Sequence, residues 1–295
     1  MALHGWIILD KPAGIGSTQC VSTVKRALRE AGEPKIKVGH GGTLDPLATG
    51  VLPIALGEAT KLAGRMLDAT KVYEFTIAFG EETDTLDTEG KVVAASETRP
   101  TLAEIEATLP RFTGPIEQVP PAYSALKIGG KAAYVRARAG ETVEMKPRNV
   151  TIQDLRLLSA TPDEATLSAT VSKGTYIRSL GRDIARALGT LGHVVMLRRT
   201  RAGPFGLESA ISLDKLADLA KARTLDGAVL PLSAGLDDIP ALPVDPDQAL
   251  LLRHGQLLAG TPATPGLYLA ISGETPVALV EVSAGDVRVV RGFNF

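Results

Sequence analysis

The stretch GHGGTLDPLATGVLPIALG, residues 39–57, holds a single acidic side chain, Asp45, among glycines and small apolar residues. Asp45 and Pro46 favour a short helix here, because Asp is a preferred N-cap, Pro is favoured at the first helical position, and Gly50 would end it. A second interpretation is that the glycines let backbone approach a ligand and leave Asp45 at the mouth of a cleft. The two are compatible, since a fixed carboxylate is what a nucleophile or base requires.

Outward from this stretch, strand and helix patterns mix irregularly. Residues 70–80 alternate apolar and polar side chains, which predicts a strand, and residues 101–112 begin with a Thr cap and continue at helical spacing. Residues 165–188 predict a strand, a turn at Gly174 and an amphipathic helix. The strict alternation of a Rossmann fold is missing, so we expect an α+β fold with a mixed, largely antiparallel sheet and flanking helices.

A domain boundary is expected within residues 235–248, where three prolines and four Asp residues break all periodicity. Short β-like runs follow it (GLYLAIS, PVALVEV and VRVVRG). We therefore predict a main domain over residues 1–238 and a small β-rich domain over residues 239–295.

Composition is typical of a globular protein, with 295 residues, 44% hydrophobic and 22% charged. The single cysteine, Cys20, excludes an internal disulfide and favours a reducing compartment. The apolar run before Asp10 is too short for a signal peptide, and no window resembles a membrane span. We expect a cytoplasmic protein that has no membrane contact.

Charge is unevenly distributed although the net charge is only −1. Residues 173–201 contain seven Lys or Arg against one Asp, and residues 127–148 contain six against two Glu. Tyr123, Tyr134 and Tyr176 lie in or beside these runs. Cations with interleaved aromatic rings are typical of single-stranded RNA recognition, although a charge run is more often a solvated face.

Other chemistries find little support in the sequence. Four scattered histidines and one cysteine give no metal-ligand spacing, and GIGST at residues 14–18 fits neither phosphate-loop pattern. No GxSxG elbow occurs, and Asp45 has no adjacent carboxylate to hold magnesium. We therefore expect neither a metal nor a cofactor.

At this point GHGGTLDPLATGVLP resembles the catalytic motif of the TruB family of pseudouridine synthases, which isomerise uridine 55 in the T loop of tRNA. Five further blocks resemble that family's motifs in the same order: LDKPAGIGST (9–18), KVYEFTIAFGEETDTLDTEG (71–90), PPAYSALKIGGKAAY (120–134), SKGTYIRSLGRDI (172–184) and LRRTRAGPF (197–205). Gly41 departs from the family pattern, where a larger residue follows the histidine, and we expect it to loosen the loop.

The resemblance implies a pseudouridine synthase catalytic domain with an RNA-gripping insertion at about residues 120–150, followed by a PUA-like RNA-binding domain. It implies a bacterial-type enzyme that works on the T arm of tRNA without a cofactor or an obligatory protein partner. A single enclosed site on one chain makes a monomer the default expectation. The reaction breaks the bond from ribose C1′ to uracil N1 and rejoins the base through C5.

The resemblance also implies catalytic roles. Asp45 would be the nucleophile or base, and Arg178 would keep it ionised by two-point pairing. Tyr73 would stack on the flipped uracil. Tyr176 lies two residues before Arg178, so in an extended segment its hydroxyl would share the face that reaches Asp45. Without the motif, Tyr73 would be assigned to the core and Arg178 to a phosphate contact.

Three further residues are expected at the RNA. Leu197 would form the apolar wall of the pocket, and His40 would occupy the gap left by the flipped nucleotide. Lys11 is assigned to substrate binding, with a structural role as its alternative, and Ser17 carries the same two interpretations. Taken alone, His40 would be a turn residue and Leu197 a core residue.

Two rival functions remain at the level of sequence. An RNA-binding or tRNA-folding module would need the basic surface but not Asp45. A metal-dependent phosphotransferase would need magnesium ligands that the sequence lacks. Whether Asp45 attacks C1′, adds to C6 or abstracts a sugar proton stays open.

Overall fold

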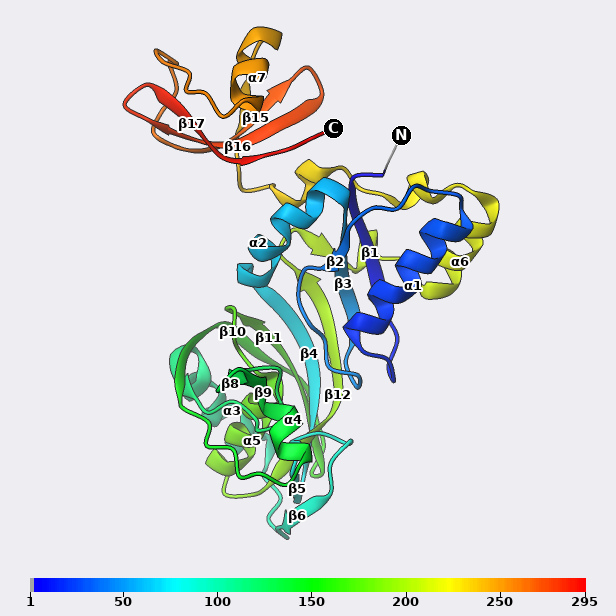
Figure 1. Cartoon of the computed structure of the whole chain (residues 1–295). Helices are drawn as coiled ribbons and strands as arrows, with labels where there is room; N and C mark the ends of the chain where they lie inside the picture. The colour runs from blue at the N-terminus through cyan, green and yellow to red at the C-terminus, as the bar shows by residue number, and fades with distance from the viewer. Residues whose placement is uncertain (1–2) are drawn as a thin grey trace.

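The computed structural model describes residues 3–295, and a nine-stranded sheet forms its centre (Figure 1). The strands are β1 Gly5–Lys11, β2 Val38–His40, β3 Thr49–Leu56, β4 Lys71–Phe79, β7 Gly114–Gln118, β10 Arg148–Ala160, β11 Glu164–Val171, β12 Gly192–Ala202 and β13 Phe205–Gly206. Their order is β1-β3-β12-β4-β11-β10-β7, with β2 on β3 and β13 on β12. Only β3 and β12 pair in parallel, so the predicted mixed, largely antiparallel sheet is confirmed.

Seven α-helices are present in the described residues: α1 Ser17–Glu30, α2 Ala63–Asp68, α3 Leu102–Thr108, α4 Ala133–Arg138, α5 Ile177–Ala187, α6 Leu213–Ala222 and α7 Pro246–Arg253. Short 3-10 turns supplement them at Gly57–Leu62, Leu109–Phe112, Leu207–Ser209, Leu225–Ala228 and Leu232–Gly235. Helix α3 begins as predicted, because the Thr101 hydroxyl accepts the N–H of Glu104 while the Glu104 carboxylate accepts the N–H of Thr101.

Helix α5 packs on the centre of the sheet, and its glycine is the reason it comes so close. An added Cβ at Gly181 would lie 2.9 Å from a methyl of Val194 and 3.4 Å from Ile77. Leu180 and Ile184 on this helix are fully buried in the main core. This packing fixes the start of α5, and with it the side chains of the active site, against β4 and β12.

The loop that carries Asp45 is not a helix, which corrects the first interpretation of this stretch. Residues 43–48 form a turn in which the N–H of Ala48 donates to the Asp45 carbonyl at 3.1 Å. Gly50 already belongs to β3, at φ +99°, and an added Cβ there would collide with the carbonyl of Arg199. Contacts from distant segments therefore override the local helix preference of Asp45 and Pro46.

Two small hairpins flank the site. Strands β5 Glu81–Thr83 and β6 Val92–Ala95 carry the acidic segment, and β8 Lys127–Ile128 pairs with β9 Lys131–Ala132 ahead of α4 in the predicted insertion. No helix within residues 3–295 is long and apolar enough to cross a membrane.

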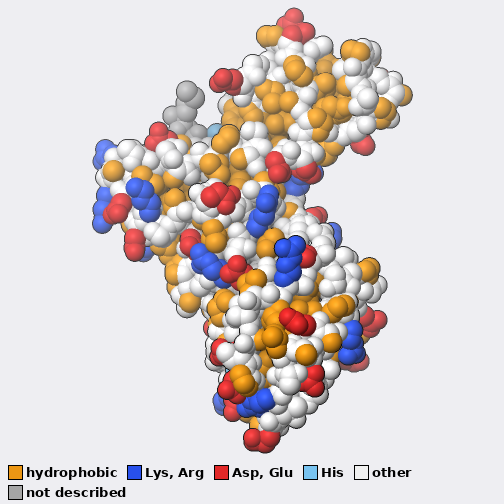
Figure 2. Space-filling view, turned by 180° about the vertical axis from the view of Figure 1, so that it is seen from behind, with side chains coloured by type: hydrophobic (Ala, Val, Ile, Leu, Met, Phe, Trp, Pro, Cys, Tyr) orange, Lys and Arg blue, Asp and Glu red, His pale blue; other side chains and the backbone are white. Residues whose placement is uncertain are grey.

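The C-terminal segment forms a second sheet, which has one hydrophobic cluster of its own, around Val277, Val280 and Val287, and contributes other residues to a cluster shared with the first sheet. Strands β14 Ala241–Pro243, β15 Gly266–Ser272, β16 Thr275–Ser283 and β17 Asp286–Gly292 pair in that order, so the three predicted β-like runs are confirmed as strands. Figure 2 shows hydrophobic side chains gathered over this part, while Lys and Arg lie scattered across the rest of the same face. That face therefore offers no continuous cationic surface.

Candidate active site

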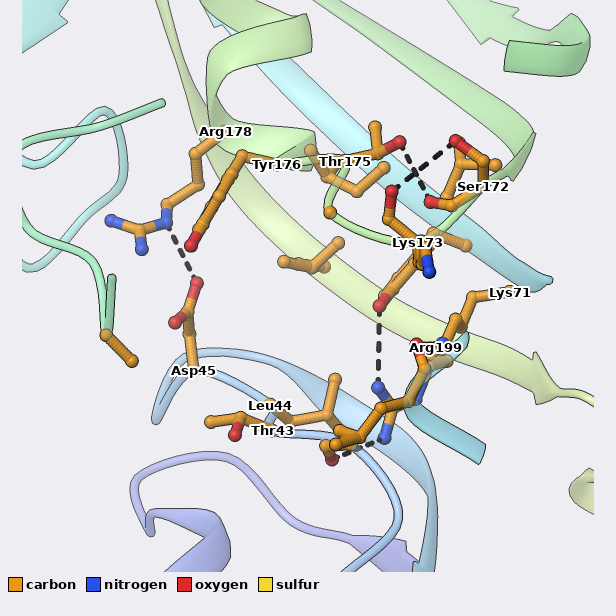
Figure 3. A pocket seen from close by; sticks show the side chains of 18 of the residues that line it. Thr43, Leu44, Asp45, Lys71, Ser172, Lys173, Thr175, Tyr176, Arg178 and Arg199 are labelled. Atoms are coloured by element: carbon orange, nitrogen blue, oxygen red, sulfur yellow. Dashed lines mark hydrogen bonds and ion pairs between the residues drawn. The ribbon is translucent and has the colours of Figure 1, made fainter. Parts of the chain in front are cut away.

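A cavity of about 540 Å³ lies between the Asp45 loop and the start of α5 (Figure 3). Its walls include Asp45, Tyr73, Tyr176, Arg178 and Leu197. Segments more than a hundred residues apart in the chain thus bring five of the seven predicted site residues together.

Arg178 lies next to Asp45 and is almost completely buried, with a side-chain exposure of 5%. Its Nε is 2.8 Å from Asp45 Oδ2, and its Nη1 is 3.3 Å from Asp87 Oδ2. The Nη groups also donate to the carbonyls of Thr85 and Tyr123 at 2.8 and 2.9 Å. The predicted two-point pairing with Asp45 is therefore wrong. One nitrogen of Arg178 faces Asp45, and the other two contact Asp87 and the carbonyls of Thr85 and Tyr123, which hold the guanidinium in place.

Asp87 is a site residue that the sequence interpretation missed. Its side chain is 1% exposed and accepts hydrogen bonds from the Thr85 hydroxyl and the N–H of Glu89. Residues 81–89 contain five acidic side chains, and the sequence does not show which of them is buried. The resemblance of residues 71–90 to a family motif indicates only that this segment belongs near the site. The buried carboxylate provides a second negative charge that holds Arg178 in place.

Tyr176 is the residue just before α5, and its N–H donates to the buried Gln118 side chain at 2.8 Å. The helix begins at Ile177, as the amphipathic pattern predicts, and Arg178 lies in its first turn, so the two residues do not share an extended segment. Both side chains nevertheless point toward Asp45 (Figure 3). Burial raises the pKa of the Tyr176 hydroxyl, and the charge of Asp45 raises it further, so the phenol is protonated at neutral pH.

Tyr73 and Leu197 form the wall opposite, on neighbouring strands β4 and β12. Arg199 lies over the Tyr73 ring at 6.0 Å from its centroid, with Nη1 3.4 Å from the hydroxyl. Arg199 is 1% exposed and also donates to the carbonyls of Val51 at 2.7 Å and Gly42 at 3.2 Å. This arginine, which the sequence interpretation counted only as part of a basic run, joins the aromatic wall to the Asp45 loop.

His40 lines a neighbouring groove of about 750 Å³ rather than the cavity itself. Asp45 and Arg178 line both spaces, and Tyr134 and Arg138 line the same groove as His40. Burial lowers the pKa of His40, and Arg199 lowers it further, so the imidazole is neutral at pH 7.

Lys11 is buried and lines neither the cavity nor the groove, so the structure favours the structural alternative over its assignment to substrate binding. It is 0% exposed, and its Nζ donates to the carbonyls of Pro12, Ile15 and Pro46 at 2.9, 2.7 and 3.2 Å. Ser17 is buried as well and exchanges hydrogen bonds with the backbone of Leu44. Both residues hold the Asp45 loop in place.

Lys71 is a further buried cation that was not predicted. It lines the cavity, is 7% exposed, and donates to the carbonyls of Leu67 and Ala69 at 2.6 Å each. Burial lowers its pKa to about 8, with Arg199 adding to the effect. Within residues 3–295, no group of three or more His, Cys, Asp or Glu side chains is placed to hold a metal ion.

These features define a class of protein. A carboxylate set by a buried arginine, an aromatic wall and an adjoining groove suit an enzyme that acts on a base extruded from a nucleic acid. Two solved structures are similar to this chain over most of its length. The chain resembles a protein of an "H/ACA RNP bound to a substrate RNA containing 2'-deoxyuridine" (26% identity, TM-score 0.75, 99% of this chain and 86% of that one). It also resembles a chain of a "Cbf5-Nop10-Gar1 Complex" (27% identity, TM-score 0.73, 98% and 84% covered).

Sequence comparison identifies the family. The model "TruB family pseudouridylate synthase (N terminal domain)" matches residues 25–177, and "tRNA pseudouridylate synthase B C-terminal domain" matches residues 178–237. Proteins called tRNA pseudouridine synthase B from Novosphingobium aromaticivorans and Zymomonas mobilis are 64% and 62% identical. The matches cover 99% and 100% of this chain and 98% and 97% of theirs. The chain belongs to the TruB family and is thus an isomerase of uridine in tRNA.

Proposed function

We propose that this enzyme isomerises uridine 55 in the T loop of tRNA, with Asp45 as the catalytic carboxylate. The observation that carries the proposal is the ion pair of Asp45 with the buried Arg178, at 2.8 Å, inside a cavity walled by Tyr73 and Leu197. A fixed guanidinium cannot lose its charge, so it supplies a permanent counter-charge beside the carboxylate when RNA closes the site to water.

The target base has to leave the folded loop to reach Asp45. Tyr73 stacks on the extruded uracil, and Leu197 bounds it on the apolar side. His40 fills the gap in the loop from the adjoining groove, where a neutral imidazole stacks without adding charge. The groove residues Tyr134 and Arg138 support this arrangement, because they bring an aromatic ring and a cation to the groove that His40 lines.

The chemistry breaks the C1′–N1 bond, turns the base and forms the C1′–C5 bond, after which the proton on C5 leaves and N1 carries one. Asp45 supplies the negative charge on which the glycosidic step depends. Tyr176 keeps its own proton, so its hydroxyl orients the base and the carboxylate by donating a hydrogen bond.

The C-terminal domain, residues 239–295, extends the RNA-binding surface as a PUA-like module. We propose that the enzyme acts in the cytoplasm as a monomer without an obligatory protein partner, because one chain supplies the cavity, the groove and every site residue named above.

The test is tritium release from an unmodified tRNA transcript labelled at uracil C5. Wild type should release about one label per tRNA, and Asp45→Asn none, while both bind the transcript alike. Asp84→Asn is the matched control, because Asp84 lines the same groove without contacting Arg178. A labelled transcript with cytidine at position 55 should release no tritium, because the target uridine is missing. Release by Asp45→Asn would remove Asp45 from the chemistry, and no release by wild type would favour an RNA-binding or folding module.

A further inference from the structure

A second, larger hollow lies along α1, away from the active site. Its volume is about 1040 Å³, and its walls are α1, residues 33–37 and the start of β2. Four exposed cations line it, together with the single acid Glu33: Lys25, Arg29, Lys35 and Lys37. We call these residues and the hollow between them the α1 groove.

The cations of the α1 groove have no anionic partners within the part of the chain that the structure describes. None of the four forms an ion pair, whereas Lys61, Arg65 and Arg186 elsewhere each lie within 2.9 Å of a carboxylate. Four unneutralised charges around one hollow create a local positive potential in a chain whose net charge is −1. Such a site attracts a ligand with several negative charges.

Two elements, α1 and β2, contribute residues both to the α1 groove and to the groove beside Asp45. Thr18, Ser22, Lys25 and Arg29 follow one another at helical spacing on one face of α1. Thr18 lines the catalytic groove, whereas Ser22, Lys25 and Arg29 line the basic hollow. Strand β2 makes the same connection on the other wall, since Val38 lines the hollow and its last residue, His40, lines the catalytic groove.

The face of α1 from Thr18 to Arg29 is long enough to contact several successive phosphates of one nucleic-acid strand. From Thr18 to Arg29 the helix rises by about 16 Å at roughly 1.5 Å per residue. Successive phosphates of one strand lie about 3.4 Å apart along the axis of a B-form DNA duplex and closer together in A-form RNA, so at least about five of them span the same length. In the proposed function the loop around the target base occupies the groove lined by His40 and Arg138. The face of α1 that carries Ser22, Lys25 and Arg29 lines the other groove.

We propose that the α1 groove binds backbone phosphates of the same tRNA outside the stem-loop that carries the target uridine. The proposal rests on the proposed function, because the RNA has to occupy the catalytic groove first. It makes the α1 groove a second contact, which distinguishes a complete tRNA from an isolated T-arm hairpin.

The experiment compares wild type with Lys35→Gln/Lys37→Gln. Lys215→Gln/Lys221→Gln on α6 is the matched control, because it removes two exposed cations that have no ion-pair partner in residues 3–295 and do not line the α1 groove. Binding of an unmodified tRNA transcript and of a T-arm hairpin is measured over a range of salt concentrations. Tritium release from both RNAs is measured in parallel.

For the α1 variant we expect binding of the complete tRNA to weaken by on the order of tenfold at low salt. Its log K against log salt slope should flatten by about 1.5, because each lost phosphate contact removes roughly 0.7 to 0.9 from the slope. Hairpin binding and conversion should stay as in wild type, and the α6 control should leave both RNAs unaffected.

An unchanged salt slope on the complete tRNA would overturn the inference, and so would an equal loss on the hairpin. The proposed function fails in a different way, namely when wild type releases no tritium from either RNA. Thermal melts that match wild type ensure that a loss of binding does not reflect unfolding.

Discussion

At the scale of single residues, the site depends on the hydrogen-bonding geometry of Arg178 as well as on its positive charge. Its guanidinium faces Asp45 with one nitrogen and is anchored by Asp87, Thr85 and Tyr123 with the others. A lysine carries the charge but has a single amine, so it cannot reach all of these groups at once.

Arg178→Lys should therefore lower the single-turnover rate by about 100-fold or more, as expected when a group that orients the reacting carboxylate is lost. The Kd for tRNA should change little, because the Arg178 side chain is only 5% exposed. Quench-flow tritium release and filter binding measure the two effects separately. A near-normal rate would show that charge suffices, and weaker binding alone would make Arg178 a phosphate contact.

Lys71 makes stability depend on pH. Its pKa is about 8 in the folded protein and 10.5 when exposed, so the unfolded chain binds more protons between these values. The free energy of unfolding then rises with pH across this window, and the rise is missing in a variant without the lysine. Below pH 8 both states are protonated and the slope vanishes.

Urea denaturation of wild type and Lys71→Met at pH 7 and pH 10 tests this. We expect the difference in unfolding free energy to move in favour of wild type by about 1 to 3 kcal/mol at the higher pH. Equal differences at the two pH values would mean that Lys71 titrates normally in the folded protein.

At the scale of elements, α2 compensates for the small residue after His40. Gly41 was expected to loosen the loop, but its N–H donates to the Pro53 carbonyl at 2.8 Å. An added Cβ at Gly41 would lie 2.7 Å from the Cβ of the buried Met66 on α2. The methionine thus occupies the space of a larger residue, and the expectation of a loose loop is wrong.

Gly41→Ala should consequently destabilise the protein by about 1 to 3 kcal/mol through overpacking, and lower activity by shifting the Asp45 loop. Gly64→Ala on α2, the helix of Met66, is the control, because nothing lies within 4 Å of its added Cβ. That change should be neutral or stabilise by up to about 1 kcal/mol. Similar effects of the two substitutions in chemical denaturation would contradict the packing argument.

Elements with a local signal were predictable from the sequence, whereas those set by distant contacts were not. Strand β4 and helix α5 follow hydrophobic periodicity, and α3 follows its Thr101 cap. The Asp45 turn was mistaken for a helix start, because its shape depends on Lys11 and on β12, which lie far away in sequence.

The candidate site divides in the same way. The motif resemblance found the residues that line the cavity, and it could not find those that hold them, such as Asp87 and Gln118. A supporting side chain owes its role to tertiary contacts, and its residue type alone is compatible with an ordinary surface loop or strand. Lys11 shows the reverse case, in which a motif residue supports the loop instead of touching substrate.

At the scale of the whole molecule, the C-terminal sheet shares a hydrophobic cluster with the part of the chain that carries the nine-stranded sheet. Trp6 and Leu232 of the main domain belong to the same buried cluster as Leu269, Leu279 and Phe293 of the C-terminal sheet. Polar contacts reinforce this boundary: Lys61 donates to the Gly292 carbonyl at 2.9 Å, and the N–H of Asn294 donates to Glu58 at 2.7 Å.

A shared core predicts that the two parts unfold together. Phe293 is 1% exposed in this cluster, so Phe293→Ala should cost about 3 to 5 kcal/mol and lower the melting temperature of the entire chain. Phe295→Ala is the matched control, since Phe295 is 54% exposed and should change stability by less than about 1 kcal/mol. Calorimetry of wild type should give one transition whose calorimetric and van't Hoff enthalpies agree. Two separate transitions, with Phe293→Ala lowering only the smaller one, would mean that the C-terminal sheet folds independently and that its place beside the catalytic body is not fixed by this core.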